Sequence, residues 1–178
     1  MTLPGKPGLH IRAAAPDDAA LIHGLILEIA DYEKLRHEVV ATVDLVREAL
    51  FPQHGLATAH ALIGEIDGVP QGYALYFFNF STFMGRPGLY LEDVFVRPVS
   101  RGRGLGKALL IALAEIAKHR NCARMEWSVL DWNTPAIEFY TSLGARPMDG
   151  WTVFRLEEAG LRTLADQAGG GDKESAKF

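Results

Sequence analysis

The chain has 178 residues, of which 48% are hydrophobic and 22% charged, and its formal net charge is −4. This composition is typical of one globular domain and excludes a largely disordered chain. The acidic balance also disfavours a general nucleic-acid-binding protein, which would carry a basic face. The single cysteine, Cys122, excludes a disulfide framework and a thiolate metal cluster and favours a reducing, cytoplasmic environment.

The two ends differ in composition from the rest of the chain. Residues 1–8 are rich in proline and glycine, and residues 167–178 are small and polar, so both are expected to be flexible. No apolar run reaches about 18 residues, the length needed to span a membrane, and the first residues lack a signal-peptide core. We therefore expect one soluble, cytoplasmic domain over residues 9–166, without a membrane partner.

The first predicted elements are a strand over residues 9–15 and a helix over residues 16–35, which begins at Pro16. A second helix over residues 42–51 starts at Thr42, whose hydroxyl suits an N-cap. Three strands follow, the first two joined by an Asp-Gly turn, over residues 60–66, 70–80 and 89–96.

The clearest predicted helix begins at Leu105, because apolar residues recur there at helical spacing as far as Ile116. After it we predict a strand over residues 124–130, a helix over 134–143 closed by Gly144, and a last strand over 151–157. The order β-α-α-β-β-β-α-β-α-β indicates an α/β fold, in which helices cover the faces of a mixed sheet.

The stretch RPVSRGRGLGK concentrates four cations and three glycines between a strand and a helix. A Walker A loop is excluded because Arg101 and Ala108 stand where it needs glycine and Ser or Thr, and a dinucleotide fingerprint because Lys107 replaces its third glycine. The remaining pattern, Arg101-x-x-Gly104-x-Gly106, lets backbone and free N–H groups approach an anion. Composition alone leaves a polyphosphate site and a solvated basic turn both open.

This pattern, in that position, resembles the acyl-CoA pyrophosphate loop of the GNAT superfamily of N-acetyltransferases. The motifs ADYEKL, LYLEDVFV, RGRGLG, WNTPAIEFY and GWTVFRL follow one another in the order seen in the spermidine/spermine N-acetyltransferase family and its thialysine-acetylating relatives. The resemblance implies a GNAT-type α/β fold with a mixed, mostly antiparallel sheet flanked by helices on both faces. It also implies acetyl-CoA as co-substrate and no metal.

The resemblance further implies roles for individual residues. Glu92 would draw the proton from the acceptor amine through water, and Tyr140 would protonate the leaving CoA thiolate. The backbone N–H of Val94 would polarise the thioester carbonyl. The residues implied in cofactor binding are Val94, Phe95, Val96, Arg101, Gly102, Arg103, Gly104, Leu105, Gly106, Lys107, Asn133, Thr134, Pro135 and Ala136.

Without the resemblance, several of these residues also fit purely structural roles. Tyr140 beside Phe139 is typical of an amphipathic helix that packs on a core, and Asn133 suits an N-cap. Glu92 and Asp93 are neighbours in a strand and point to opposite faces, so at least one must face the interior or a cleft. A buried carboxylate without a partner is costly, so that residue should have one.

The acceptor site is predicted from acidic, aromatic and hydroxyl side chains, namely Tyr32, Glu33, Glu92, Glu126, Trp127 and Ser128. Three glutamates from separate elements that meet at one cleft mouth would favour a cationic amine, although each is also typical of solvated surface. Polyamine-acetylating relatives often carry a further acid before the strand at 88–96, where this chain has Ser81 and Thr82. A short diamine or a thialysine-like amine is therefore expected to match or exceed spermine as acceptor.

We thus expect an acetyl-CoA-dependent N-acetyltransferase that acts on a small primary amine by direct transfer in a ternary complex. The resemblance also implies a homodimer, and the net charge argues against a nucleic-acid partner. An amino-acid or protein amine as acceptor, and a non-catalytic CoA-binding module on the same fold, stay open as alternatives. The six histidines show no metal-ligand spacing.

Overall fold

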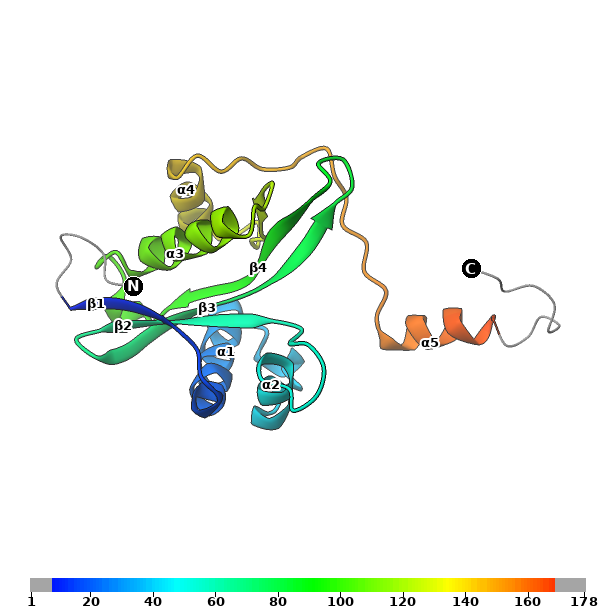
Figure 1. Ribbon diagram of the computed structural model, residues 1–178, viewed down its shortest axis with the longest axis horizontal. Helices are drawn as coiled ribbons and strands as arrows, with labels where there is room; N and C mark the ends of the chain where they lie inside the picture. Colours follow the sequence, from blue (N-terminus) through cyan, green and yellow to red (C-terminus); the bar gives the residue numbers. More distant parts are fainter. Residues whose placement is uncertain (1–7, 169–178) are drawn as a thin grey trace. The chain divides into compact units, whose positions relative to one another are not determined.

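The computed structural model describes residues 8–168 (Figure 1). The chain divides into two compact units, Met1–Ser128 and Val129–Phe178, which are described separately below. Most of the two ends that the sequence predicts to be flexible lies outside the described residues.

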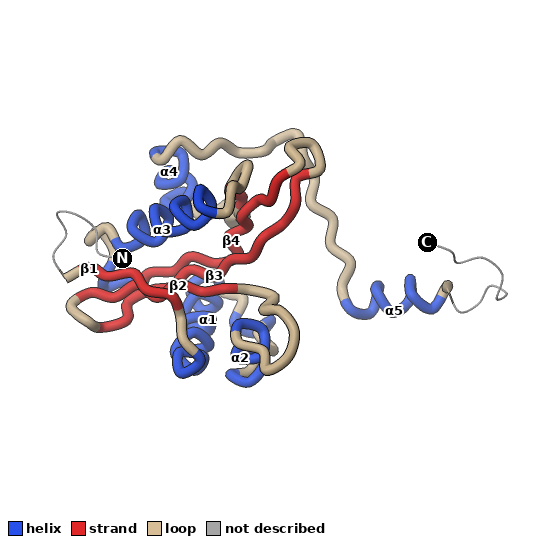
Figure 2. Tube along the Cα trace, in the orientation of Figure 1, coloured by secondary structure: helices blue, strands red, loops and turns tan. Residues whose placement is uncertain are grey.

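The first unit is built around a five-stranded sheet with the order β1-β2-β3-β4-β5 (Figure 2). Its strands are β1 (Leu9–Ala13), β2 (His60–Ile66), β3 (Val69–Ser81), β4 (Arg86–Val96) and β5 (Met125–Glu126). The first four pair antiparallel, and β5 pairs in parallel with β4. The predicted mixed, mostly antiparallel sheet is confirmed.

Helices cover both faces of this sheet, as predicted. The helices α1 (Ala19–Glu33) and α2 (Val43–Leu50) lie on one face, and α3 (Leu105–His119) lies on the other (Figure 1). Thr42 caps α2 as expected, because its hydroxyl accepts a hydrogen bond from the N–H of Leu45 at 3.2 Å. Pro16 begins a short 3₁₀ turn, Pro16–Asp18, and α1 starts directly after it.

The apolar face of α3 fixes this helix on the sheet. Leu105, Leu109 and Leu113 are at most 1% exposed. Burial of each such side chain contributes about 1.5–3 kcal/mol to folding. Leu105 fits closely because Gly64 on β2 has no side chain, and a Cβ there would lie 2.8 Å from its Cδ1. This packing of Leu105 against β2 therefore fixes the start of α3 and the end of the glycine-rich loop before it.

A β-bulge interrupts the pairing of β3 with β4. Leu75 is opposite Asp93 and Tyr76 is opposite Leu91, which leaves Glu92 as the extra residue. A bulge shifts the alternation of side chains along its strand. Asp93 consequently lies on the face covered by α1, whereas Leu91 lies on the face covered by α3.

The second unit contains α4 (Thr134–Ser142) and α5 (Glu158–Asp166). The predicted helix over 134–143 is confirmed, and Gly144 ends it with a φ of +90°, the left-handed conformation that favours glycine. The helix α5 was not predicted, because its sequence carries only a short amphipathic pattern.

Two predicted strands differ in the structure. The strand expected over 124–130 is reduced to Met125–Glu126. The strand expected over 151–157 is not formed: none of those residues belongs to a helix or strand. Its apolar side chains instead are exposed, Val153 to 84% and Phe154 to 91%. An alternating pattern becomes a strand only beside a partner strand, and within the described residues this segment has none.

Candidate active site

The loop that follows β4 is anchored to α1 and β3. The main-chain N–H of Arg97 donates to the carbonyl oxygen of Gln71 at 2.9 Å. Its guanidinium binds the carboxylate of Glu28 on α1, with Nη2 to Oε1 at 2.7 Å, and the carbonyl oxygen of Pro70. The hydroxyl of Ser100 donates to the side chain of Gln71. Arg97 thus holds the loop in place, and its charge is paired with Glu28 rather than directed toward a phosphate.

Two glycines turn this loop into the start of α3. Gly102 has a φ of +76° and Gly104 a φ of +90°, which other residues rarely adopt. The first hydrogen bond of the helix runs from the N–H of Ala108 to the carbonyl oxygen of Gly104, at 3.0 Å. The N–H groups of residues 105–107 precede it and have no acceptor within the helix. Such an end binds an anion well.

Two cations beside the loop are exposed and available to a polyphosphate. Lys107 is exposed on the first turn of α3. Nη2 of Arg103 contacts a carboxylate oxygen of Asp67 at 3.4 Å, and both side chains are more than half exposed. Such surface pairs contribute little, so Arg103 can exchange this partner at small cost. The loop, the helix end and these cations fit a pyrophosphate group.

Arg101 reaches toward α1. Its Cζ atom lies 4.5 Å from the centre of the Tyr32 ring and 5.9 Å from that of Phe95. Its Nε donates to the carbonyl oxygen of Val96 at 3.0 Å. Arg101 therefore links the end of β4 to Tyr32, one of the residues predicted to bind the acceptor, by a cation–π contact.

Two carboxyl groups lie close together between α1 and β4. The hydroxyl of Tyr73, a fully buried side chain, donates to Oδ2 of Asp93 at 2.9 Å. Burial raises the pKa of Asp93 above its usual range, against the opposite effect of this hydrogen bond. Burial and the charge of Asp93 also raise the pKa of Glu33 at the end of α1. The expectation that one strand acid faces the interior with a partner is confirmed.

Glu92, the residue of the bulge, is exposed while its neighbour Asp93 is half-buried. Within the described residues, the edge of β4 that faces β5 has a neighbouring strand along only part of its length. It pairs with β5 only at Leu89–Met125 and Tyr90–Glu126, although it continues to Val96. Among the described residues, the backbone edge of residues 91–96 therefore has no strand beside it, as a bound linear group would require.

The polar residues around β5 form a network of their own. Oε2 of Glu126 forms an ion pair with Nε of Arg124 at 2.8 Å and accepts a hydrogen bond from Nδ2 of Asn79 at 3.4 Å. Trp127 is half-buried, and the hydroxyl of Ser128 lies 3.0 Å from that of Tyr90. Glu126 is thus paired with a cation in this structure.

The other expected hydroxyl near the acceptor is also occupied. Ser81 is only 3% exposed, and its Oγ accepts hydrogen bonds from Nη1 of Arg124 at 2.8 Å and from the N–H of Met84. Its part is therefore structural, because it closes the turn between β3 and β4.

In the second unit, the predicted residues lie together on the first turns of α4. Asn133 precedes the helix as its N-cap, Thr134 and Pro135 are exposed, and Ala136 is half-buried. Tyr140, also half-buried, lies one turn further along, with its ring centre 5.5 Å from that of Phe139.

Comparison with known proteins identifies the family. The chain matches the Acetyltransferase (GNAT) family over residues 26–145. It belongs to that family. The resemblance predicted from the five motifs is confirmed, and the chain is an acetyl-CoA-dependent N-acetyltransferase.

Several known proteins are similar to this acetyltransferase over most of their length. Thialysine N-epsilon-acetyltransferase of Sus scrofa is 39% identical over 166 residues, covering 87% of this chain and 96% of that protein. L-ornithine N5-acetyltransferase of Arabidopsis thaliana is 30% identical, covering 86% of both chains. An integron cassette protein from the mobile metagenome of V. cholerae has a similar structure, with a TM-score of 0.73, 26% identity, and coverage of 89% and 98%.

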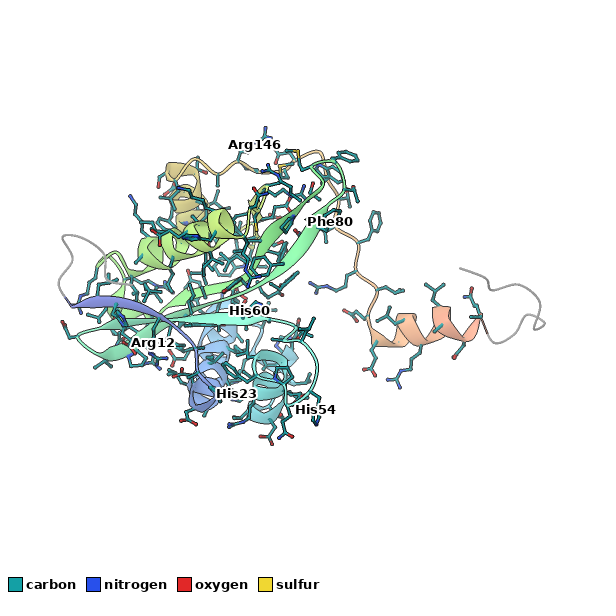
Figure 3. The ribbon with its side chains drawn as sticks, in the orientation of Figure 1. Arg12, His23, His54, His60, Phe80 and Arg146 are labelled. Carbon is teal, nitrogen blue, oxygen red and sulfur yellow. The ribbon has the colours of Figure 1, made fainter. Side chains whose placement is uncertain are left out.

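No metal site is evident in the part of this acetyltransferase that the structure describes, where no three His, Cys, Asp or Glu side chains form a group suited to an ion. His23, His54 and His60 lie at separate places (Figure 3). Within residues 8–168, no helix combines the length and apolar character needed to cross a membrane.

Sequence reasoning missed the partners of several site residues in this acetyltransferase. Tyr73 and Arg124 were expected only as members of strands and Glu28 as a member of a helix, without a role in the site. The only available signal was Tyr73 itself, since a buried tyrosine hydroxyl usually needs a hydrogen-bond partner.

Proposed function

We propose that this acetyltransferase moves the acetyl group of acetyl-CoA directly to a small primary amine within a ternary complex. The observation that carries the proposal is the anion-binding start of α3 beside the strand that holds Glu92 and Asp93. The relatives named above support a small amine as acceptor, because their names specify thialysine and L-ornithine.

In this proposal the first unit binds acetyl-CoA along the end of β4 and the start of α3. The N–H groups of residues 105–107, with Arg103 and Lys107, hold the pyrophosphate. The edge of β4 at residues 94–96 binds the arm that leads to the thioester. The N–H of Val94 donates to the acetyl oxygen, where it stabilises the negative charge that develops during attack. Residues 133–136 of the second unit contribute further contacts to the same arm.

Acid–base chemistry is assigned to two residues. A lysine-like amine has a pKa near ~10.4 and must lose a proton before it can attack. Glu92, exposed at the bulge, takes that proton through water. The amine nitrogen then bonds to the acetyl carbon while the carbon–sulfur bond breaks. Tyr140 donates its phenolic proton to the departing thiolate, and the second proton that the acetylated nitrogen loses restores the phenol through water. The products are the amide and the CoA thiol.

The cationic acceptor is held by Glu33 and Asp93, in the proposal, with Tyr32 beside them. A bound ammonium would favour the charged forms of both carboxyl groups and so offset the cost of their burial. An amine of a protein substrate is less favoured as acceptor, because the relatives' names specify the amino acids thialysine and L-ornithine.

Two features outside the site complete the proposal. The exposed apolar side chains Val153 and Phe154 of the second unit, and Phe80 and Phe83 of the β3–β4 hairpin, support a homodimer (Figure 3 labels Phe80). The free thiol of Cys122 supports a cytoplasmic location.

The test is a screen of thialysine, L-lysine, L-ornithine, short diamines, spermidine and spermine with acetyl-CoA, read out by release of the CoA thiol. We expect thiol release with at least one small amine. Tyr140→Phe should lower kcat by about ten-fold or more, as expected for loss of a general acid, and leave acetyl-CoA binding nearly unchanged.

Binding of acetyl-CoA without thiol release from any amine would contradict the proposal and favour a non-catalytic CoA-binding module. Full activity of Tyr140→Phe would assign Tyr140 to the packing of α4 instead.

A further inference from the structure

The ion pair of Arg124 and Glu126 lies on the sheet face that also carries Asp93. Leu75 and Phe77 are two residues apart on β3 and share a face. Their partners on β4 are Asp93 and Tyr90. Tyr90 in turn pairs with Glu126 on β5. Glu126 on β5 and Asp93 on β4 therefore lie on the same face of the sheet.

The spacing between these positions is short. Asp93 and Tyr90 are separated by two steps of β3, about 7 Å along the sheet. Glu126 lies one strand further, at about 4.8 Å. A lysine-like chain whose head group is bound at Glu126 can place its terminal amine beside Asp93 and the exposed Glu92.

Arg124 and Glu126 can each still bind a ligand group, which would be negatively charged at Arg124 and positively charged at Glu126. Nε of Arg124 binds Glu126 and its Nη1 binds Ser81. Among the described residues, neither Nη2 of Arg124 nor Oε1 of Glu126 takes part in a hydrogen bond. Both side chains are also accessible, since they are 42% and 36% exposed. The hydroxyls of Ser128 and Tyr90 lie beside them.

An adjacent cation and anion suit a ligand that carries both charges. A carboxylate binds the guanidinium, and an α-ammonium group binds the glutamate and the hydroxyls. A diamine or polyamine offers only ammonium groups, so it would leave Arg124 unpaired and facing a like charge. The pair therefore favours an amino acid over a diamine or polyamine, whereas a slot lined only by acids would bind the ammonium groups of both.

We propose that Arg124 and Glu126, with the hydroxyls of Ser128 and Tyr90, bind the α-carboxylate and α-ammonium groups of a free amino acid whose side chain ends in a primary amine. This inference rests on the proposed N-acetyltransferase function and specifies its acceptor class. Arg124 is the residue that determines specificity.

The test compares acceptors that differ only in the carboxylate. L-lysine and 1,5-diaminopentane have the same chain and terminal amine, and L-lysinamide keeps the α-amine but has no negative charge. We expect kcat/KM to be at least about ten-fold higher for L-lysine than for either of the other two. Only L-lysine can form the hydrogen bond between its carboxylate and the guanidinium of Arg124. Thialysine should behave as L-lysine does.

Substitutions at Arg124 should change this ranking. Arg124→Gln should lower kcat/KM for L-lysine and thialysine by about ten- to a hundred-fold, mainly through KM. It should leave kcat/KM for 1,5-diaminopentane and L-lysinamide unchanged or raise it, because it removes the like charge that faces their ammonium groups. Arg124→Lys keeps the charge and should restore part of the preference for L-lysine.

Ser81→Ala is the matched control, because it removes a structural contact of Arg124 and keeps the guanidinium. It should leave the ratio of the L-lysine and diamine values unchanged. Equal losses for all acceptors in Arg124→Gln, or a wild-type preference for the diamine, would overturn the inference while leaving amine acetylation intact. If no amine is acetylated, the inference and the proposed function are both wrong.

Discussion

The carboxyl group of Asp93 accepts a hydrogen bond from the hydroxyl of Tyr73 and lies near the carboxyl of Glu33. Burial raises the pKa of Asp93 in the folded protein above that in the unfolded chain, so the folded state holds the proton more tightly. The resulting contribution to stability is fully present below the unfolded pKa, about 3.9. It is lost as the pH rises through the folded pKa.

Asp93→Asn should therefore gain stability relative to wild type as the pH rises. The amide is neutral at every pH and its carbonyl oxygen can still accept the hydrogen bond from Tyr73. Urea unfolding between pH 4 and pH 8 measures the free energy of unfolding of both proteins. The exposed Glu115→Gln on α3 is the control and should show a constant difference from wild type. A constant difference for Asp93→Asn would contradict the assignment.

Some of these residue-level features follow from the sequence and others do not. Strand alternation required a partner for Glu92 or Asp93, because an unpaired buried acid is costly. It gave no means of choosing between them, because the choice depends on the bulge at Glu92. The partner, Tyr73, is 20 residues away in the chain and meets Asp93 only through the register of β3 with β4.

At the scale of elements, α3 separates the tasks of packing and binding. Its leucines attach it to the sheet, whereas the N–H groups of its first turn have no acceptor within the helix and suit an anion. Both could be predicted, since apolar spacing and the positions of Gly102 and Gly104 are local properties of the sequence. The glycine-rich loop was open to two interpretations, and the family match supports the anion-binding one.

Gly104→Val tests the role of this turn. A φ of +90° is strained for a branched side chain, by roughly 1–2 kcal/mol, so the backbone before α3 should shift. We expect the KM for acetyl-CoA to rise about ten-fold or more with little change in helical content by circular dichroism.

The matched control is Gly144→Val, because Gly144 also has a φ of +90° and follows a helix. That variant carries the same strain away from the loop and should keep the wild-type KM for acetyl-CoA. An unchanged KM in folded Gly104→Val would mean that the loop is only a turn.

Elements that depend on distant partners were predicted less well. Residues 151–157 alternate as a strand does, but alternation reports two unlike faces and not the presence of a neighbouring strand. The strand expected over 124–130 is short for the same reason, the lack of a neighbouring strand, because β5 pairs with β4 only as far as Glu126. Its network with Arg124 could not be foreseen, because it joins β5 to the end of β3.

At the scale of the whole molecule, the second unit carries apolar residues that are exposed in the described structure. Val153 and Phe154 are 84% and 91% exposed. Exposed apolar patches on a soluble protein often mark a contact with another chain. We therefore expect wild type to sediment as a homodimer at micromolar concentration, at twice the chain mass of 19.5 kDa.

Val153→Glu should weaken that dimer by ten-fold or more in dissociation constant, because a charge would be buried at the contact. Val40→Glu is the matched control, since Val40 is 85% exposed in the first unit, and it should leave sedimentation unchanged. A wild-type protein that is fully active as a monomer would contradict the proposed homodimer.

The bulge at Glu92 is one residue more than the pairing of β4 with β3 requires. Deletion of this residue would restore regular alternation and keep every other pair, so Leu89 and Leu91 would still lie on the α3 side. Both leucines are at most 1% exposed, and the core would keep them. The sheet can therefore gain or lose the carboxylate at this position, by deletion or by substitution, without a change in its packing.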